Sequence, residues 1–555
     1  MRFESDSSVW KKHWKKLKTS NKNTVFRTVF FHTINTKGGE GLKPSTHSVF
    51  YRISILTASG IVLNLLGFAY RIFLGRAAGA EGMGIYQLVL PFYSFLQAVT
   101  LSGLTMAVST LAAEEAAHGS FFGAQIALKR GRRLFLLLFF CIACLTLCCS
   151  EFIGEHLLGN AETRNSLLLL LPCLLLTGFE NLYKNYFYGI GVSRPPITSE
   201  LTEQSVRFLA VALLLSLRKP QSPGEICACI VLGMVLSEIV SVVLLSRFFK
   251  KVPPTRVHTT RSRLISVAAP LTLSAVANTL LSSLGAVLIP QRLVVFGYSE
   301  AQAISEYGVL FGMTIPLLTL PFALLGPLTL VLVPRLAESM VLRNHSDVRR
   351  KAGKALHMSG LLACFSTALL IPLANPLSQL LYGQKTAEAF LLPLCLVTFL
   401  GFYQLISAAI LSGIGKQRAA ALHVILGGVV QLGGTWAVGH FGMVGFLVGN
   451  LLSTLLIALL NLRTVQSALS LRVPWRNWLV TPTLSGLLSC LCVRAVFLRM
   501  IADGLSLLLA ILFSAGLGLA LYLCALRAQG TSFLRYFHTL IPQQSSSQIP
   551  RVPLP

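Results

Sequence analysis

Fourteen apolar segments follow one another along this 555-residue chain, and most are long enough to cross a bilayer. No loop between them is large enough to hold a folded soluble domain. Apolar residues (AVILMFWYC) make up 54% of the chain and charged residues 12%, about half the charged share of soluble domains. The pattern predicts an all-α polytopic membrane protein and excludes a soluble enzyme, a disordered chain and a disulfide-stapled secreted domain. The segments lie at residues 53–74, 85–112, 134–153, 167–189, 202–217, 226–249, 264–291, 308–333, 356–381, 389–412, 419–438, 443–462, 478–498 and 505–526.

The basic residues are distributed unevenly between alternate loops. With fourteen spans, 37 of the 47 Lys and Arg fall on the side that holds both termini, and 8 fall near the other side. Loops rich in Lys and Arg stay in the cytoplasm, so both termini are predicted to be cytoplasmic. The formal net charge of +27 therefore records orientation in the membrane rather than binding to nucleic acid.

The chain also contains an internal repeat with an offset of 224 residues. Gly84 matches Gly308 under this offset, and the Gly-Ile-Gly run at 189–191 matches the one at 413–415. Because six spans lie in each copy, the two copies enter the membrane in the same direction. Parallel repeats of this kind place a binding site between the halves and favour a transporter that works by alternating access.

The repeat divides the chain into five parts. A basic arm, 1–52, precedes an N-terminal lobe at 53–250 and a C-terminal lobe at 264–465, which hold spans one to six and seven to twelve. Spans thirteen and fourteen, at 478–526, lie outside the duplication and are followed by a tail, 527–555. The eighth span is rich in proline and is predicted to bend.

The basic arm contains a short amphipathic pattern. Trp10, Trp14 and Leu17 fall on one face of a predicted helix, with lysines around the remaining face. Such a helix suits the anionic lipids of a cytoplasmic membrane surface better than nucleic acid.

Short runs in both copies of the repeat resemble a known family. Residues 67–71 read Gly-Phe-Ala-Tyr-Arg, and residues 79–88 read Gly-Ala-Glu-Gly-Met-Gly-Ile-Tyr-Gln-Leu. The second copy continues the likeness with Pro-Gln-Arg-Leu at 290–293 and Tyr-Gly at 307–308. Over roughly residues 53–526 the chain resembles polysaccharide and lipid-linked oligosaccharide flippases. The similarity is to the stage V sporulation protein B-like branch of the multidrug/oligosaccharidyl-lipid/polysaccharide (MOP, MATE-like) exporter superfamily.

The resemblance implies two six-helix lobes that face a central cavity, with two further helices. It also implies transport of undecaprenyl-diphosphate-linked sugars to the outer leaflet for wall or spore-cortex synthesis. The sequence departs from the family pattern at two positions. Asn64 stands where members often carry a cationic residue, and Gly285 stands where many carry an acidic one. The two losses could compensate each other, or could mark altered coupling or a different substrate.

A lipid-linked oligosaccharide carries an anionic diphosphate, which needs cationic partners because burying an unpaired charge is costly. Arginine suits phosphate since its guanidinium donates two parallel hydrogen bonds. Arg71 and Arg292 lie near corresponding ends of the first and seventh spans and are the first candidates for substrate binding, followed by Arg76. The alternative is that each arginine only anchors its span at the membrane interface. Asn64 is a candidate for binding sugar hydroxyls.

Three ionisable residues lie well inside predicted spans, where such residues are rare and count as functional by default. Glu180 and Lys184 are four residues apart on one helix and can pair with each other. Asn181 and Asn185 continue this polar stripe and could line the sugar path or join helices. Glu238 has no obvious partner and is a candidate proton or cation site. Glu180, Lys184 and Glu238 are the predicted coupling residues.

The sequence shows no sign of an enzyme. It contains no Walker loop for phosphates and no Ser/His/Asp constellation, and its twelve cysteines lie in apolar segments among Leu, Ile and Phe. Packing is the better interpretation of these cysteines than metal binding. We expect no cofactor and no metal.

The sequence therefore favours a monomeric, multi-pass transporter of the bacterial plasma membrane that flips an undecaprenyl-diphosphate-linked oligosaccharide by alternating access. A cation-coupled multidrug or metabolite antiporter of the same superfamily is the alternative. The expected partners are the lipid-linked substrate and the membrane lipids, not nucleic acid.

Overall fold

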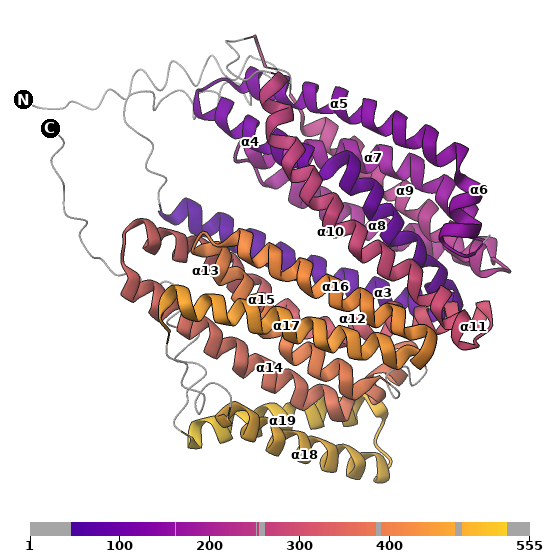
Figure 1. Ribbon diagram of the computed structural model, residues 1–555, viewed down its shortest axis with the longest axis vertical. Coiled ribbons are helices and arrows are strands. Elements are labelled where there is room, and N and C mark those ends of the chain that lie inside the picture. The colour runs from indigo at the N-terminus through magenta and orange to yellow at the C-terminus, as the bar shows by residue number, and fades with distance from the viewer. Residues whose placement is uncertain are drawn as a thin grey trace, which may run out of the picture. The chain divides into compact units, whose positions relative to one another are not determined.

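The computed structural model describes residues 46–160, 162–250, 252–254, 261–383, 390–471 and 480–529. All regular elements in these ranges are helices, which confirms the predicted all-α fold (Figure 1). The amphipathic segment predicted in the arm lies outside the described residues. The α-helices are α3 (Thr46–Gln97), α4 (Gly103–Ala117), α5 (Phe121–Cys148), α6 (Ser150–Phe152), α7 (Thr163–Gly189), α8 (Arg194–Arg218), α9 (Pro223–Phe248), α10 (Arg261–Phe296), α11 (Glu300–Tyr307), α12 (Ile315–Thr319), α13 (Leu325–Val341), α14 (His345–Tyr382), α15 (Leu391–Gly413), α16 (Gln417–Phe441), α17 (Met443–Leu469), α18 (Thr481–Ala502) and α19 (Leu507–Ala528).

Twelve helical segments in the described ranges are long and apolar enough to cross a membrane, rather than the predicted fourteen. One of them, Val62–Ala117, contains the first two predicted spans. The chain bends within it at Gly79, whose φ of 67° and ψ of −174° are essentially restricted to glycine. Helix α8 is not among the twelve. It carries Glu200, Glu203 and Arg207, so its apolar stretch is short.

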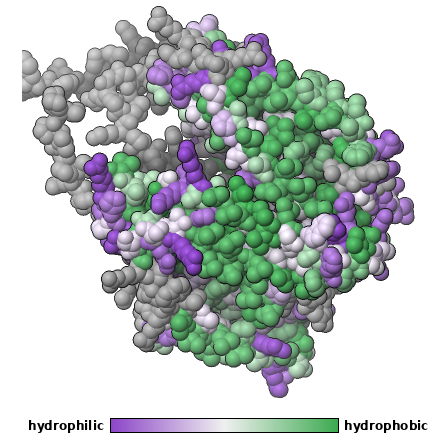
Figure 2. All heavy atoms as spheres, in the orientation of Figure 1, coloured by the Kyte–Doolittle hydropathy of each residue, from purple (hydrophilic) through white to green (hydrophobic). Residues whose placement is uncertain are grey.

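The helices pack in two groups (Figure 1). Helices α4, α5, α7, α8 and α9 contact one another and form what we call the N-terminal bundle, and α13 to α17 form the C-terminal bundle. Helix α10 packs against both α4 and α16 and so joins the two bundles. Figure 2 shows hydrophobic residues gathered over the middle of one face, with hydrophilic residues toward the ends of the helices. This distribution fits a protein that spans a bilayer.

The predicted eighth span is broken into short pieces. A π-helical turn, Gly308–Thr314, follows α11, and a 3-10 turn, Leu320–Leu324, separates α12 from α13. Pro316 and Pro321 lie at the starts of α12 and of the 3-10 turn, where the missing N–H is tolerated. Three helical geometries therefore follow one another in this proline-rich span, which is irregular rather than one continuous α-helix.

The two copies of the repeat touch each other at matching residues. Gly84 of α3 and Gly308 pack so closely that a Cβ on Gly308 would lie 2.9 Å from the Gly84 Cα. One turn further along α3, Gln87 Nε2 donates to the carbonyl oxygen of Phe311 at 3.3 Å, and these residues are again 224 positions apart. Contacts between equivalent residues occur only close to the axis that relates two copies, so the repeat axis passes near this point.

Gly84→Ala tests this contact. A Cβ at Gly84 would collide with the backbone carbonyl of Ile304 in α11, which no side-chain rotation relieves. We expect the variant to lose about 1–3 kcal/mol of stability, measured as a lower thermal unfolding temperature in detergent. The matched control is Gly67→Ala in α3, where nothing lies within 4 Å of the added Cβ and helix propensity improves. Equal unfolding temperatures for the two variants would show that the contact between Gly84 and Ile304 can accommodate a methyl group.

The last two helices pack as a pair on α14 (Figure 1). Ser489 Oγ of α18 donates to the carbonyl oxygen of Gly518 in α19 at 2.8 Å. Tyr522 of α19 donates to the carbonyl oxygen of Leu361 in α14, also at 2.8 Å. Both hydroxyls are buried, so these bonds satisfy polar groups that would otherwise be costly inside a bilayer.

Candidate functional site

Two of the predicted substrate ligands lie on α3, just before its bend. Arg71 is exposed and acts electrostatically on the hydroxyls of Tyr86 in α3 and of Tyr382 at the end of α14. The Arg71 guanidinium therefore interacts electrostatically with residues of both copies of the repeat. Arg76 is engaged in a different way: its Nε donates to the carbonyl oxygen of Leu381 at 2.6 Å and its Nη2 to that of Leu380.

The Arg76 contact ties α3 to the end of α14. The two carbonyls belong to the last turn of α14, whose final carbonyl groups have no partner inside the helix. A guanidinium is well suited to such a helix end, which carries a partial negative charge. The neighbouring Gly75 packs against the ring of Tyr382, and a Cβ there would lie 2.6 Å from Cδ1. In this conformation Arg76 links α3 to the C-terminal bundle rather than standing free for a substrate.

Arg292 of α10 lies against the C-terminal bundle. Its guanidinium carbon lies 3.4 Å from the centre of the Trp436 ring in α16, which is a close cation–π contact. Trp436 remains 56% exposed. The pair offers a cation beside an aromatic face, which is compatible with both a phosphate and a sugar ring.

The predicted sugar ligands are scattered rather than gathered. Asn64 is exposed on α3, whereas Asn181 and Asn185 of α7 are half-buried. Asn185 Nδ2 donates to the carbonyl oxygen of Asn181 at 2.9 Å, within its own helix. At the second departure from the family pattern, Gly285, nothing lies within 4 Å of a Cβ position, so a larger side chain fits there.

The predicted coupling residues lie together inside the N-terminal bundle. Lys184 Nζ lies 2.8 Å from Glu180 Oε1, which confirms the predicted pairing along α7. The same ammonium lies 3.2 Å from Glu203 Oε2 and 3.7 Å from Glu200 Oε1, both on α8. Lys184 therefore joins α7 to α8 through two carboxylates, in addition to its pair within α7.

The prediction that Glu238 lacks a partner is wrong. Arg207 of α8 lies with its Nη2 3.3 Å from Glu238 Oε1 on α9, and the same nitrogen pairs with Glu203. Arg207 Nε also donates to Ser237 Oγ at 3.3 Å. Sequence reasoning missed Glu203 and Arg207 because they fall at the polar start of the predicted span 202–217. Helix α8 begins eight residues earlier, at Arg194, and places both residues well inside the helix.

Glu180, Lys184, Glu203, Arg207 and Glu238 make up what we call the ion network. The carboxylates of its three glutamates lie within 4.8 Å of one another. All three glutamates are buried, with Glu238 only 3% exposed. Serine hydroxyls from both neighbouring helices complete the surroundings, since Ser241 of α9 donates to Glu180 and bonds Ser199 of α8.

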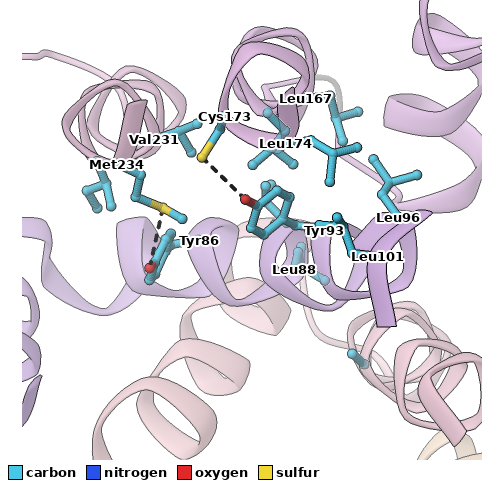
Figure 3. Close-up of a cluster of buried hydrophobic side chains, with 14 of the residues drawn as sticks. Tyr86, Leu88, Tyr93, Leu96, Leu101, Leu167, Cys173, Leu174, Val231 and Met234 are labelled. Atoms are coloured by element: carbon cyan, nitrogen blue, oxygen red, sulfur yellow. Dashed lines mark hydrogen bonds between the residues drawn. The ribbon is translucent and has the colours of Figure 1, made fainter. Parts of the chain in front are cut away.

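Two tyrosines of α3 contact the helices that carry the network (Figure 3). Tyr86 and Tyr93 of α3 point their hydroxyls toward Met234 of α9 and Cys173 of α7. Tyr93 Oη also lies 2.8 Å from Thr177 Oγ1, one turn before Glu180 on α7. The half of α3 that carries the tyrosines is thus packed on the same two helices that carry the network.

Comparison with known proteins places the chain in a family. The sequence profile described as "Polysaccharide biosynthesis protein" matches residues 51–340. The chain is similar to stage V sporulation protein B of Bacillus subtilis (strain 168), with 26% identity over 438 residues that cover 76% of this chain and 85% of the relative.

Two solved structures share the fold. The inward closed conformation of the lipid II flippase MurJ superposes with a TM-score of 0.65 at 13% identity and covers 85% of this chain and 98% of that one. The inward-facing conformation of a multidrug resistance MATE family transporter of the MOP superfamily gives a TM-score of 0.60 at 15% identity, covering 75% and 99%. Together with the profile match over more than half its length, this fold shows that the chain is a multi-span membrane protein of the polysaccharide biosynthesis protein family.

Proposed function

We propose that the protein flips a lipid-linked oligosaccharide, carried on undecaprenyl diphosphate, across the bacterial plasma membrane by alternating access. The observation that carries the proposal is the position of Arg71, an exposed cation on α3, one turn before Gly75, where α3 packs against the ring of Tyr382 in the other copy of the repeat. A diphosphate needs such a cation, because its charge would otherwise be costly to bring between the bundles. Arg292 with Trp436 supplies a second cation and an aromatic face.

The contact around Gly84 and Gly308 supports alternating access. Under the predicted topology, the bend at Gly79 and the end of α14 face the outside of the cell, so Arg76 and the glycine contact close the outer end. Opening that end would break the Arg76 bonds and free its guanidinium. Arg76 then becomes available to the substrate only in the outward-open state.

The proposal also includes the expectations that the sequence gives for assembly, topology and partners. The protein is a monomer with both termini in the cytoplasm, its partners are the lipid-linked substrate and the surrounding lipids, and it performs no chemistry on the substrate. It uses no cofactor, metal or nucleic acid. Names of relatives support the substrate class: one is a flippase for lipid II, and another is a sporulation protein.

Translocation of a fluorescent undecaprenyl-diphosphate sugar in proteoliposomes tests the function. We expect the purified protein to move the label between leaflets, detected by accessibility to a membrane-impermeant quencher. Empty vesicles set the background rate. A rate equal to that background, with protein shown to be folded and inserted, would remove the flippase assignment.

The ion network supports an antiporter as the second candidate. Cation-coupled export of a drug or metabolite requires buried carboxylates, and the network contains three. The two candidates separate in one experiment, because an antiporter expels ethidium against a proton or sodium gradient and leaves the labelled lipid unflipped. A flippase gives the opposite pair of results.

A further inference from the structure

The buried charges of the ion network do not balance. Glu180, Glu203 and Glu238 contribute three carboxylates, whereas Lys184 and Arg207 contribute two cations. One negative charge is therefore in excess among five side chains that are at least 84% buried. Leaving such a charge unpaired in a bilayer interior is strongly unfavourable. The arrangement favours uptake of one positive charge.

A single atom marks where that charge would bind. Glu238 Oε2 is buried and has no hydrogen-bond partner among the described residues, although its other oxygen pairs with Arg207. The hydroxyl of Tyr70, which is 7% exposed and acts electrostatically on Arg207, is likewise without a partner in this part of the chain. Four other carboxylate oxygens of the network are paired with a cation, and one of them also accepts from Ser241. They are Glu180 Oε1, both oxygens of Glu203, and Glu238 Oε1.

The missing charge is better supplied by a proton than by a metal ion. Lys184 and Arg207 already lie between the carboxylates, and a metal placed among them would be repelled at close range. Sodium or a divalent cation also requires several oxygen ligands, whereas most of these oxygens are in use. A proton needs one oxygen and turns Glu238 from an acceptor into a donor.

The groups that face Glu238 come from three helices. They are Glu180 and Cys173 of α7, Glu203 and Arg207 of α8, and Tyr93 of α3. Two carboxylates beside a third favour its neutral form, because like charges at short distance cannot all be ionised at once.

A route to the network begins at the loop between α7 and α8. Glu203 lies nine residues from the start of α8, about 14 Å along the helix. Glu200 lies one turn closer to the loop, its side chain is 32% exposed, and it lies 3.7 Å from Lys184 Nζ. A proton entering from this side would pass Glu200 and Lys184 before reaching the three buried glutamates.

We infer that the ion network is a one-proton site, centred on Glu238, that couples substrate movement to the proton gradient. The inference rests on the proposed transport function and deepens it by naming the coupling ion and two further residues, Glu203 and Arg207. The proton comes from water on the α7–α8 loop side and leaves to water when the bundles rearrange. No bond other than the O–H bond forms or breaks.

Infrared spectroscopy of the reconstituted protein tests the site without any substrate. Lowering the pH should produce the band of a protonated carboxyl in the wild-type protein. Glu238→Gln should abolish this band, Glu238→Asp should move it, and Glu225→Gln, an exposed acid on the same helix, should leave it intact. Sodium added at constant pH should have no effect. Persistence of the band in Glu238→Gln, or its loss on adding sodium, would overturn the inference.

A transport measurement gives the stoichiometry. For one coupled proton, each pH unit across the vesicle should change the steady-state transport ratio about tenfold, and Glu238→Gln should make this ratio independent of pH. A ratio that still follows the gradient in Glu238→Gln contradicts the inference. If the labelled lipid is not flipped by the wild-type protein but the infrared band behaves as expected, the proton site stands and the proposed substrate is wrong.

Discussion

Arg207→Met is expected to lower the free energy of unfolding by about 3–5 kcal/mol, because removing one member of a buried ion pair leaves the others uncompensated. Arg207 pairs with both Glu203 and Glu238 and so joins α8 to α9. Methionine keeps an unbranched apolar stem and removes the guanidinium. The measurement is the thermal unfolding temperature of the detergent-solubilised protein at neutral pH.

A control and a second variant make this prediction specific. Arg194→Met changes an exposed arginine at the start of the same helix, and surface substitutions of this kind usually change stability by no more than about 0.5 kcal/mol. Adding Glu238→Gln to Arg207→Met should restore part of the loss, since one of the stranded charges disappears. If the double variant is less stable than Arg207→Met alone, charge imbalance is not the cause.

Arg71→Ala is expected to slow flipping of the labelled lipid by about 10- to 100-fold. This range corresponds to the 1.5–3 kcal/mol typical of a hydrogen bond to a charged group. Because Arg71 is exposed and has no ion pair among the described residues, its loss should leave the unfolding temperature almost unchanged. The measurement is the initial rate of quencher accessibility in proteoliposomes.

The matched control for Arg71→Ala is Arg499→Ala at the end of α18. That arginine is also exposed and forms a local pair with Asp503 at 3.2 Å. The Arg499→Ala variant should flip the labelled lipid at the wild-type rate. If both variants are equally slow, surface charge rather than a specific ligand determines the rate.

The helical, multi-span fold was predictable because a bilayer leaves an apolar chain few alternatives. The repeat was also visible in sequence, and the structure brings Gly84 and Gly308 into contact. Helix boundaries were harder to predict. Hydropathy alone placed the fifth span at 202–217, whereas α8 begins at Arg194. It carries Glu203 and Arg207, which only burial against α7 and α9 makes tolerable.

The candidate site was predictable only in part. Glu180 and Lys184 stood out because their spacing lies within one helix. The pairing of Glu238 with Arg207 could not be predicted, since the two residues lie on different helices and no sequence spacing links them. The i, i+4 spacing of Glu203 and Arg207 was the available signal. Likewise, nothing local to Arg76 indicates that it bonds the end of α14, some 300 residues away.

The composition of α8 has a consequence for how the chain is made. A helix that carries Glu200, Glu203 and Arg207 is costly to release into lipid alone, since each charged residue near the centre of a span adds about 2.5–3.5 kcal/mol to the free energy of insertion. Lys184, the partner of Glu203, is already present on α7 when α8 is synthesised, but Glu238, the partner of Arg207 on α9, is synthesised only afterwards. We expect α8 to wait beside the insertion machinery until α9 emerges, so that the three helices enter the bilayer as one unit.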